Sequence, residues 1–351
     1  MAGIPINEVR IKENADLTAL NTLGVKATAD TLVEIEFKEH LIALHKSGYF
    51  ESATPYILGG GSNVLLLDNL SKPVLKVSIP GIEVKKEEGN HIFIEIGAGV
   101  NWHNLVEYCV TNNYGGIENL ALIPGTTGAA PIQNIGAYGV ELDQVFDSLE
   151  LFDIKSGKLK TYLKEECEFG YRDSIFKRDL KGKVIVTGVT LRLTKSHHLI
   201  NTGYKALSEF LKEKSINSPD LKDIFDAVVA IRKSKLPDPS LLGNAGSFFK
   251  NPIVENSVAN KLKTNYSDMP AYMVDDSHQK IPAGWLIEKA GWKGKKIGNV
   301  GTYRNQALVI VNHGDATGRE IYDHAMRIRE SVSKKFGISL MPEVNIFGNQ
   351  V

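Results

Sequence analysis

Residues 118–142, ENLALIPGTTGAAPIQNIGAYGVEL, restrict the fold of this chain more than any other segment. Four glycines and two prolines interrupt the segment, which is typical of a long loop rather than of a helix or a regular strand. Its central part, residues 119–140, carries no charged side chain. Backbone N–H groups left open in such a loop form anion nests of the kind that suit a pyrophosphate.

A second uncharged glycine run, GGGSN at 59–63, lies inside PYILGGGSNVLLLD (55–68), whose pattern predicts strand, glycine turn and strand. Taken alone, either run is explained more simply by glycines that permit tight turns between elements. Two such runs, both rich in Ser, Thr or Asn and both uncharged, favour a site for a phosphate-containing ligand.

The remaining patterns predict an α+β protein. Strands are expected at 32–37, within 74–96, at 148–154 and at 183–193, and helices at 38–47, 102–113, 223–235 and 322–337. The polar, lysine-rich stretch KEKSINSPDLKD (212–223) marks a plausible domain boundary.

Composition excludes several classes of protein. Lys plus Arg and Asp plus Glu number 41 each, so no net field attracts nucleic acid or anionic lipid. Two cysteines, Cys109 and Cys167, are too few for a disulfide framework and fit a reducing compartment. The first residues lack the apolar core of a signal peptide, and no apolar run approaches the roughly 18 residues of a membrane span. We therefore expect a soluble cytoplasmic protein.

Common nucleotide, metal and hydrolase motifs do not occur in this chain. Neither GGGSNV (59–64) nor GAGVNW (97–102) has the third glycine of a Rossmann fingerprint, and no GxxxxGK[ST] is present. HExxH and CxxC are absent, so a metal site has little support. Ser62 and Ser247 both lie outside a GxSxG elbow.

Six motifs in order nevertheless resemble one family: ILGGGSNVLL, IPGTTGAAPIQNIGAYGVEL, FGYRDSIFK, GNAGSFFKNP, PAGWLIEKAGWKG and MPEVNIFG. Together they are similar to the UDP-N-acetylenolpyruvoylglucosamine reductases (MurB), flavoenzymes of bacterial peptidoglycan precursor synthesis. The resemblance runs from about residue 15 to residue 348, and the insert around 196–220 with Tyr204 points to the family's first type.

The resemblance implies an α+β fold with a two-lobed FAD-binding domain of the vanillyl-alcohol-oxidase type and a C-terminal substrate domain. The expected parts are lobe 1 at 15–80, lobe 2 at 81–215 and the substrate domain at 216–336. The C-terminal residues 337–351 are expected to return to lobe 1.

The family also gives roles to the two glycine runs. The first would wrap the FAD pyrophosphate, and the second would line the phosphates and the isoalloxazine. The implied cofactor-binding residues are Gly59, Gly60, Gly61, Ser62, Asn63, Thr126, Thr127, Gly128, Gln133, Asn134, Ala137 and Tyr138. FAD is expected to bind non-covalently, with NADPH as the reductant.

Three residues match the family's catalytic positions: Arg172, Ser247 and Glu343. The implied reaction moves a hydride from reduced FAD to C3 of an enolpyruvyl ether, followed by protonation at C2. Arg172 would clamp and polarise the substrate carboxylate, Glu343 would help to hold the intermediate, and Ser247 would donate the proton. Alone, each residue would more simply be a surface ion pair, a solvated carboxylate or a capping serine.

The substrate-binding residues implied by the resemblance are Tyr204, Lys235, Asn251, Tyr272 and Gln306. Tyr204 would close over the nucleotide, and Lys235 would meet the diphosphate of UDP-N-acetylglucosamine enolpyruvate. The expected protein is a monomer without nucleic-acid or membrane partners. Two alternatives stay open: an FAD-linked oxidase of the same fold, although 118–142 holds no His or Cys for covalent flavin attachment, and a catalytically silent nucleotide-binding module.

Overall fold

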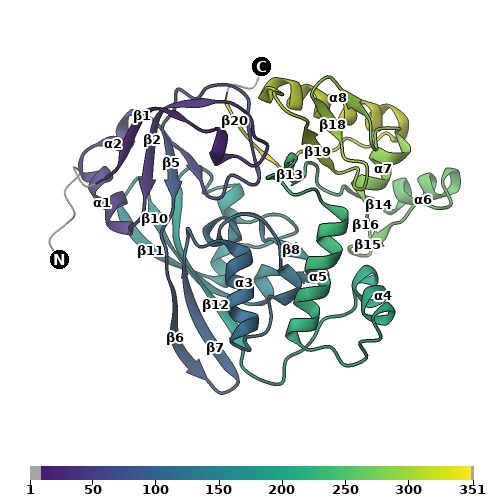
Figure 1. Cartoon of the computed structure of the whole chain (residues 1–351), viewed down its shortest axis with the longest axis horizontal. Helices are drawn as coiled ribbons and strands as arrows, with labels where there is room; N and C mark the ends of the chain where they lie inside the picture. The colour runs from purple at the N-terminus through teal and green to yellow at the C-terminus, as the bar shows by residue number, and fades with distance from the viewer. Residues whose placement is uncertain (1–8, 349–351) are drawn as a thin grey trace. The chain divides into compact units, whose positions relative to one another are not determined.

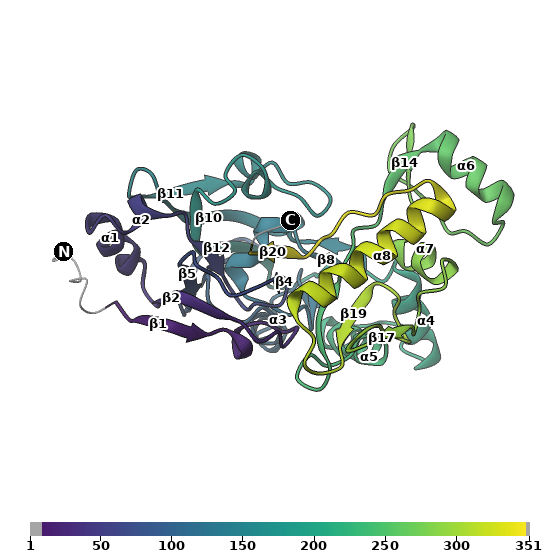
Figure 2. The same cartoon turned by 90° about the horizontal axis from the view of Figure 1, so that it is seen from above.

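The computed structural model describes residues 9–348, which form two compact units (Figures 1 and 2). Unit 1 contains residues 9–15, 29–60 and 70–234, and unit 2 contains residues 16–28, 61–69 and the chain from Lys235 onward. Helices and strands are mixed in both units, so the expected α+β class is confirmed.

A small sheet in unit 1 holds β1 (Ile11–Asp16), β2 (Thr28–Ile35), β5 (Val74–Val77) and β3 (Tyr56–Leu58), in that order. The three strands β2, β5 and β3 run parallel. Between β2 and β3 lie α1 (Lys38–Lys46) and α2 (Tyr49–Ser52). The strand and helix expected at 32–37 and 38–47 therefore form, and their apolar side chains Val33, Ile35, Leu41 and Leu44 are buried in one core.

The larger sheet of unit 1 is antiparallel, in the order β11 (Lys158–Leu163), β10 (Phe146–Asp153), β12 (Val184–Thr194), β7 (His91–Gly97) and β6 (Ile82–Glu88). Three helices complete the unit: α3 (Trp102–Thr111), α4 (Lys205–Glu213) and α5 (Leu221–Lys235). Helices α3 and α5 lie next to each other in Figure 1. The rings of His103 on α3 and Phe225 on α5 stack with their centroids 5.5 Å apart.

The grouping of α5 differs from the expected boundary at 215/216. Its residues Ile224, Ala227, Val228 and Ile231 follow the helical spacing of a buried face and join the core of unit 1. Within the polar stretch 212–223, residues 214–220 form a mostly exposed connection between α4 and α5, so the composition marks solvent exposure rather than the end of a unit. The chain divides after Ser234.

The glycine- and proline-rich segment 118–142 forms short turns in place of long elements. It contains the 3₁₀ turns Glu118–Leu120, Thr127–Ala129 and Pro131–Gln133, and a short hairpin of β8 (Gly136–Ala137) and β9 (Val140–Glu141). Three of its non-glycine residues, Leu122, Asn134 and Tyr138, have positive φ angles of 58°, 41° and 50°. The expected irregular loop is thus confirmed.

Unit 2 holds an antiparallel sheet in the order β13 (Gly243–Ser247), β19 (Val309–Asn312), β18 (Val300–Thr302) and β17 (Lys296–Ile297). A three-stranded sheet contains β14 (Ile253–Glu255), β16 (His278–Lys280) and β15 (Tyr272–Met273). The helices of this unit are α6 (Asn256–Asn265), α7 (Ala283–Lys289) and α8 (Gly318–Phe336), and α8 lies alongside β19 in Figure 2.

The C-terminal strand β20 (Asn345–Phe347) pairs in parallel with β4 (Val64–Leu66), and both strands belong to unit 2. Residues 55–68 therefore form the expected strand, turn and strand, but β3 and β4 join different sheets. The end of the chain returns to residues 64–66, while positions 349–351 lie outside the described residues. Within residues 9–348, no helix has both the length and the apolar composition required to cross a membrane.

His324 is a buried imidazole on α8. Its Nε2 lies 3.1 Å from the Oγ1 of Thr302, and its ring meets the ring of Trp292 edge-on at 5.2 Å. Its Nδ1 has no hydrogen-bond partner within residues 9–348. Burial, helped by the positive charges of Arg327 and Lys295, lowers the pKa of His324 from 6.5 to about 4.

This pKa makes stability depend on pH. Below pH 6.5 the unfolded chain binds a proton that the folded chain binds only near pH 4, so the free energy of unfolding falls as the pH falls through this window. We predict that His324→Gln makes the urea midpoint, followed by tryptophan fluorescence, less dependent on pH between 4 and 6.5. The exposed His197→Gln serves as the control and should keep the wild-type slope. An unchanged slope in His324→Gln would contradict the prediction.

Candidate functional site

Gly59 and Gly60, the part of the first glycine run that belongs to unit 1, lie tightly against the 118–142 segment. A Cβ on Gly60 would lie 2.8 Å from the Cα of Gly125, and a Cβ on Gly59 would lie 2.5 Å from the Oγ1 of Thr126. Only glycine permits this approach. The N–H of Gly60 donates no hydrogen bond to any residue within 9–348, and Gly60 is exposed. An accessible glycine N–H beside a second uncharged loop fits a phosphate oxygen.

The two threonines of the second run have different surroundings. Thr127 is fully buried, and both its N–H and its hydroxyl bond to the carbonyl of Val100, at 2.8 and 3.1 Å. The N–H of Gly128 bonds to the carbonyl of Ala98 at 2.9 Å. Thr127 and Gly128 therefore attach the loop to the end of β7, while the partly exposed Thr126 faces Gly59.

The side chain of Asn134 makes hydrogen bonds that link the 118–142 loop to itself and to neighbouring residues. Its side-chain amide donates to Glu141 at 3.1 Å and to the carbonyl of Gly170 at 3.3 Å, and its Oδ1 accepts the N–H of Asp143 at 3.0 Å. These bonds stabilise the left-handed conformation of Asn134, which is itself buried. The amide thus holds the turn that carries Gln133, Ala137 and Tyr138.

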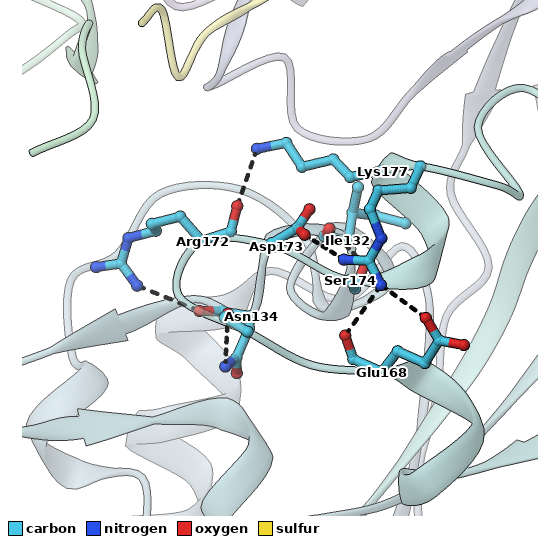
Figure 3. A network of polar contacts seen from close by, with 9 residues as sticks. Ile132, Asn134, Glu168, Arg172, Asp173, Ser174 and Lys177 are labelled. Atoms are coloured by element: carbon cyan, nitrogen blue, oxygen red, sulfur yellow. Dashed lines mark hydrogen bonds and ion pairs between the residues drawn. The ribbon is translucent and has the colours of Figure 1, made fainter. Parts of the chain in front are cut away.

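Arg172 lies in a turn close to Asn134, and Figure 3 shows its guanidinium directed at that residue. Its Nη1 donates to the carbonyl of Asn134 at 3.2 Å, and its Nη2 donates to the carbonyl of Gly136. The φ angle of Arg172 is +53°, a left-handed conformation that is unfavourable for a side chain of this size. Next to this turn Arg178 pairs with Asp173 and with Glu168, which stabilises the turn.

Tyr138 and Tyr204 are in contact within unit 1. Their rings meet edge-on with centroids 5.1 Å apart, and Tyr204 directly precedes α4. Asn119 bridges the two segments, because its amide donates to the carbonyls of Tyr138 and Asn201 at 3.0 and 2.9 Å. The side-chain amide of Asn201 donates a hydrogen bond to the carbonyl of Gly139 at 3.0 Å.

Sequence reasoning missed Arg232, which shares this environment. Its Nε donates to the carbonyl of Leu122 at 3.3 Å. Burial lowers the pKa of the Arg232 guanidinium; Tyr138 opposes this effect, and the positive charge of Arg172 adds to it. A signal existed in the sequence, since Arg232 lies four residues after Val228, on the apolar face of α5. A partly buried arginine near another arginine favours an anionic ligand.

In unit 2, a β-bulge positions Ser247. Asn244 pairs with Val311 and Ser247 pairs with Val309, so two residues of β13, Ala245 and Gly246, oppose the single residue Ile310 of β19. Gly246, one of the two, has a φ angle of +66°, and its N–H bonds to the Oδ1 of Asn244 at 3.0 Å. The Ser247 hydroxyl is exposed and makes no hydrogen bond within residues 9–348, so the alternative of a capping serine has no support there.

Ser247 and Glu343 lie on adjacent chain segments. The N–H of Glu343 donates to the carbonyl of Phe248 at 2.8 Å, and the N–H of Lys250 donates to the carbonyl of Met341 at 2.9 Å. Asn63 from the first glycine run joins them, because its amide lies 3.4 Å from the Glu343 carbonyl. Phe248 and Phe249 are buried.

Two of the expected substrate residues, Asn251 and Gln306, each lie close to the start of α7. The Oδ1 of Asn251 accepts the N–H of Ala283 at 2.9 Å, and a Cβ on Gly284 would lie 3.1 Å from the Oε1 of Gln306. Tyr272 is exposed on β15, and Lys235 is exposed at the last position of α5.

Comparisons with known proteins agree with this arrangement. Residues 29–162 match a family model described as an FAD binding domain, and residues 238–347 match the C-terminal domain model of UDP-N-acetylenolpyruvoylglucosamine reductase. Proteins of that name from Amoebophilus asiaticus and Flavobacterium johnsoniae are 47% and 43% identical to this chain over 336 and 338 residues. These alignments cover 96% of this chain in both cases and 99% and 100% of the two relatives.

A solved structure also shares the fold. The crystal structure of UDP-N-acetylenolpyruvylglucosamine reductase (MurB) from Thermus caldophilus superimposes with a TM-score of 0.65 at 24% identity and covers 97% of this chain and 99% of that one. The FAD-binding domain model and the curated relatives define a flavin-dependent oxidoreductase. The chain belongs to the UDP-N-acetylenolpyruvoylglucosamine reductase family.

The bulge at Gly246 allows a direct test of how Ser247 is positioned. A side chain with positive φ costs about 1–2 kcal/mol, so we predict that Gly246→Ala loses stability and slows oxidation of the reduced flavin by the enolpyruvyl substrate. Gly291→Ala is the matched control, because Gly291 has a φ angle of +80° and, like Gly246, has open space around it. The control should lose similar stability in urea and keep the substrate step. Equal rates for the two variants would show that the bulge does not orient Ser247.

Proposed function

We propose that this chain reduces UDP-N-acetylglucosamine enolpyruvate to UDP-N-acetylmuramate in peptidoglycan precursor synthesis, with non-covalent FAD and with NADPH as reductant. Family membership and the FAD-binding domain support the reaction and the cofactor. When bound and reduced, FAD supplies the hydride that adds to C3 of the enolpyruvyl group. The residues of the chain must then orient the substrate, stabilise negative charge and provide a proton.

The proposal rests most directly on the pairing of 247–250 with 341–343. This pairing gives an exposed hydroxyl and a carboxylate neighbouring positions in unit 2. Ser247 donates its proton to C2 of the substrate, and Glu343 helps to hold the intermediate. A hydroxyl is a weak acid in water, but a carbanionic C2 is a strong base, so a short transfer between them is feasible.

Arg172 is proposed to hold the substrate carboxylate. The bonds from its guanidinium to the carbonyls of Asn134 and Gly136 fix the plane of the group before substrate binds. Such preorganisation stabilises the charge that develops on the carboxylate during hydride addition. Arg232 adds a second positive charge to the same part of unit 1.

The remaining expected residues keep their proposed roles. Gly59, Gly60, Gly61, Ser62 and Asn63 face the FAD pyrophosphate, with Thr126, Thr127, Gly128, Gln133, Asn134, Ala137 and Tyr138 along the phosphates and flavin. Tyr204, Lys235, Asn251, Tyr272 and Gln306 bind the UDP substrate. The lobes at 15–80 and 81–215 then hold FAD, and substrate is held by the part of the expected 216–336 domain that belongs to unit 2, from Lys235 onward. We further propose a cytoplasmic monomer without nucleic-acid or membrane partners, since its charges balance at 41 each.

The mode of FAD attachment has a simple test. Covalent attachment through the loop would need a His or Cys in 118–142, and neither occurs there. Acid precipitation should therefore release all yellow colour into the supernatant. Colour retained in the protein pellet would contradict non-covalent binding and favour the alternative oxidase.

Ser247→Ala separates a proton donor from a structural serine. FAD content and flavin reduction by NADPH should stay near wild-type values, because that half-reaction needs no proton on the substrate carbon. Oxidation of the reduced flavin by the enolpyruvyl substrate should slow by roughly 10²–10⁴-fold, the usual contribution of general acid catalysis. Stopped-flow absorbance measures both half-reactions.

Ser247→Cys is the companion variant, and it should retain more activity than Ser247→Ala because a thiol can still deliver a proton. Thr302→Ser is a suitable control, because Thr302 carries a buried hydroxyl in unit 2 that lies outside the paired segments 247–250 and 341–343. This variant should leave both half-reactions intact. A wild-type rate of flavin oxidation in Ser247→Ala would show that Ser247 is not the acid.

A further inference from the structure

Lys76 is an unusual residue in its strand. The other three residues of β5 (Val74, Leu75 and Val77) are buried and apolar, and β5 lies between β2 and β3 in its sheet. Side chains of a strand alternate between its two faces, so Leu75 and Val77 enter the core of unit 1 while Lys76 is directed to the other face. An ammonium group in an inner strand requires a polar partner, because burying a charge without one is costly.

Two polar groups lie near Lys76. Its register neighbour on β2 is Glu34, which also pairs with Arg10 at 2.9 Å and with Lys12 at 3.6 Å. The hydrogen bond of the ammonium goes instead to the carbonyl of Gly59. Burial lowers the pKa of Lys76, and the charge of Glu34 opposes that effect.

Gly59 is the first residue after β3, so Lys76 contacts the start of the glycine turn. In a trans peptide the C=O of Gly59 and the N–H of Gly60 point in opposite directions. An ammonium that holds this carbonyl therefore directs the N–H of Gly60 away from Lys76, toward the exposed side of the turn. That N–H donates no hydrogen bond within residues 9–348, which is the state required of a group that receives a ligand.

The opposite side of the turn is also restricted. Gly60 approaches the backbone of Gly125 too closely for any Cβ, and Gly59 approaches the side chain of Thr126. The peptide between Gly59 and Gly60 is thus held by the ammonium on its carbonyl and by 125–126 along its edge. Both restraints lie within unit 1.

We propose that Lys76 is a positioning residue for the FAD pyrophosphate: it holds the carbonyl of Gly59 so that the N–H of Gly60 is presented to a phosphate oxygen. This inference rests on the proposed function, in which 59–63 bind that pyrophosphate. Lys76 acts through the turn, and the ligand class is a diphosphate-containing flavin nucleotide rather than the flavin ring itself.

The test compares flavins with and without the diphosphate. Apoprotein of Lys76→Met is titrated with FAD and with riboflavin, with quenching of flavin fluorescence as the readout. The FAD dissociation constant should rise roughly 10- to 100-fold, as expected for loss of a charge-assisted bond that orients the site. The riboflavin dissociation constant should change less than twofold, and the absorption spectrum of saturated FAD should stay as in wild type.

Control variants separate this role from general stability. Lys72→Met removes an exposed lysine close to β5 that lies over the Tyr56 ring, and it should bind FAD as wild type does. Lys76→Arg keeps a cationic donor and should recover most of the FAD affinity. If Lys76→Met does not fold, Lys76→Gln, which keeps a neutral donor, is titrated in its place and should show an intermediate loss.

Wild-type FAD affinity in Lys76→Met or Lys76→Gln would overturn the inference, and so would an equal loss of affinity for FAD and riboflavin. Failure of the proposed function is measured separately, because the reduced flavin of the wild-type holoenzyme would then not be oxidised by the enolpyruvyl substrate, whatever the FAD affinities of the Lys76 variants.

Discussion

Hydrogen bonds from buried polar side chains hold the irregular segment 118–142, and the proposed cofactor site of unit 1 depends on them. A loop with four glycines and two prolines has few regular backbone bonds of its own, so its groups must be paired elsewhere. Glu118 accepts the N–H of Gly116 at 2.7 Å, and Asn119 and Asn134 bond to backbone groups on both sides of the segment. Burial raises the pKa of Glu118, as expected for a carboxyl placed inside a core.

The residues of the two glycine-rich segments, 59–63 and 118–142, therefore fall into two kinds. The polar groups of Thr127 and Asn134 are used to maintain the loop, whereas the N–H of Gly60 is left open to solvent. A residue in a binding motif therefore need not touch the ligand, because it can act by fixing the conformation of the residues that do. Arg172 combines both roles in our proposal, since its guanidinium bonds to the loop while its charge serves the substrate.

In unit 2, backbone pairing positions individual side chains, namely those of Ser247 and Glu343. The bulge before Ser247 changes the register of β13 against β19, and the bonds from 248–250 to 341–343 then fix the neighbouring carboxylate. Both features belong to backbone pairing rather than to flexible side chains. Short strands suffice for this purpose because each residue is held by an adjacent segment.

The sequence by itself determined the local structure and the family. Glycine and proline content predicted the irregular loop, helical spacing predicted α1, α3, α5 and α8, and six ordered motifs indicated a flavin-dependent reductase. Only the tertiary structure decided that β20 pairs with β4, that α5 joins the core of unit 1, and that Lys76 and Arg232 adjoin the loops. The physical reason is that periodicity tells which face of an element is buried but not against what. Partners distant in the chain, such as Phe248 and Glu343, become neighbours only through the path of the folded backbone.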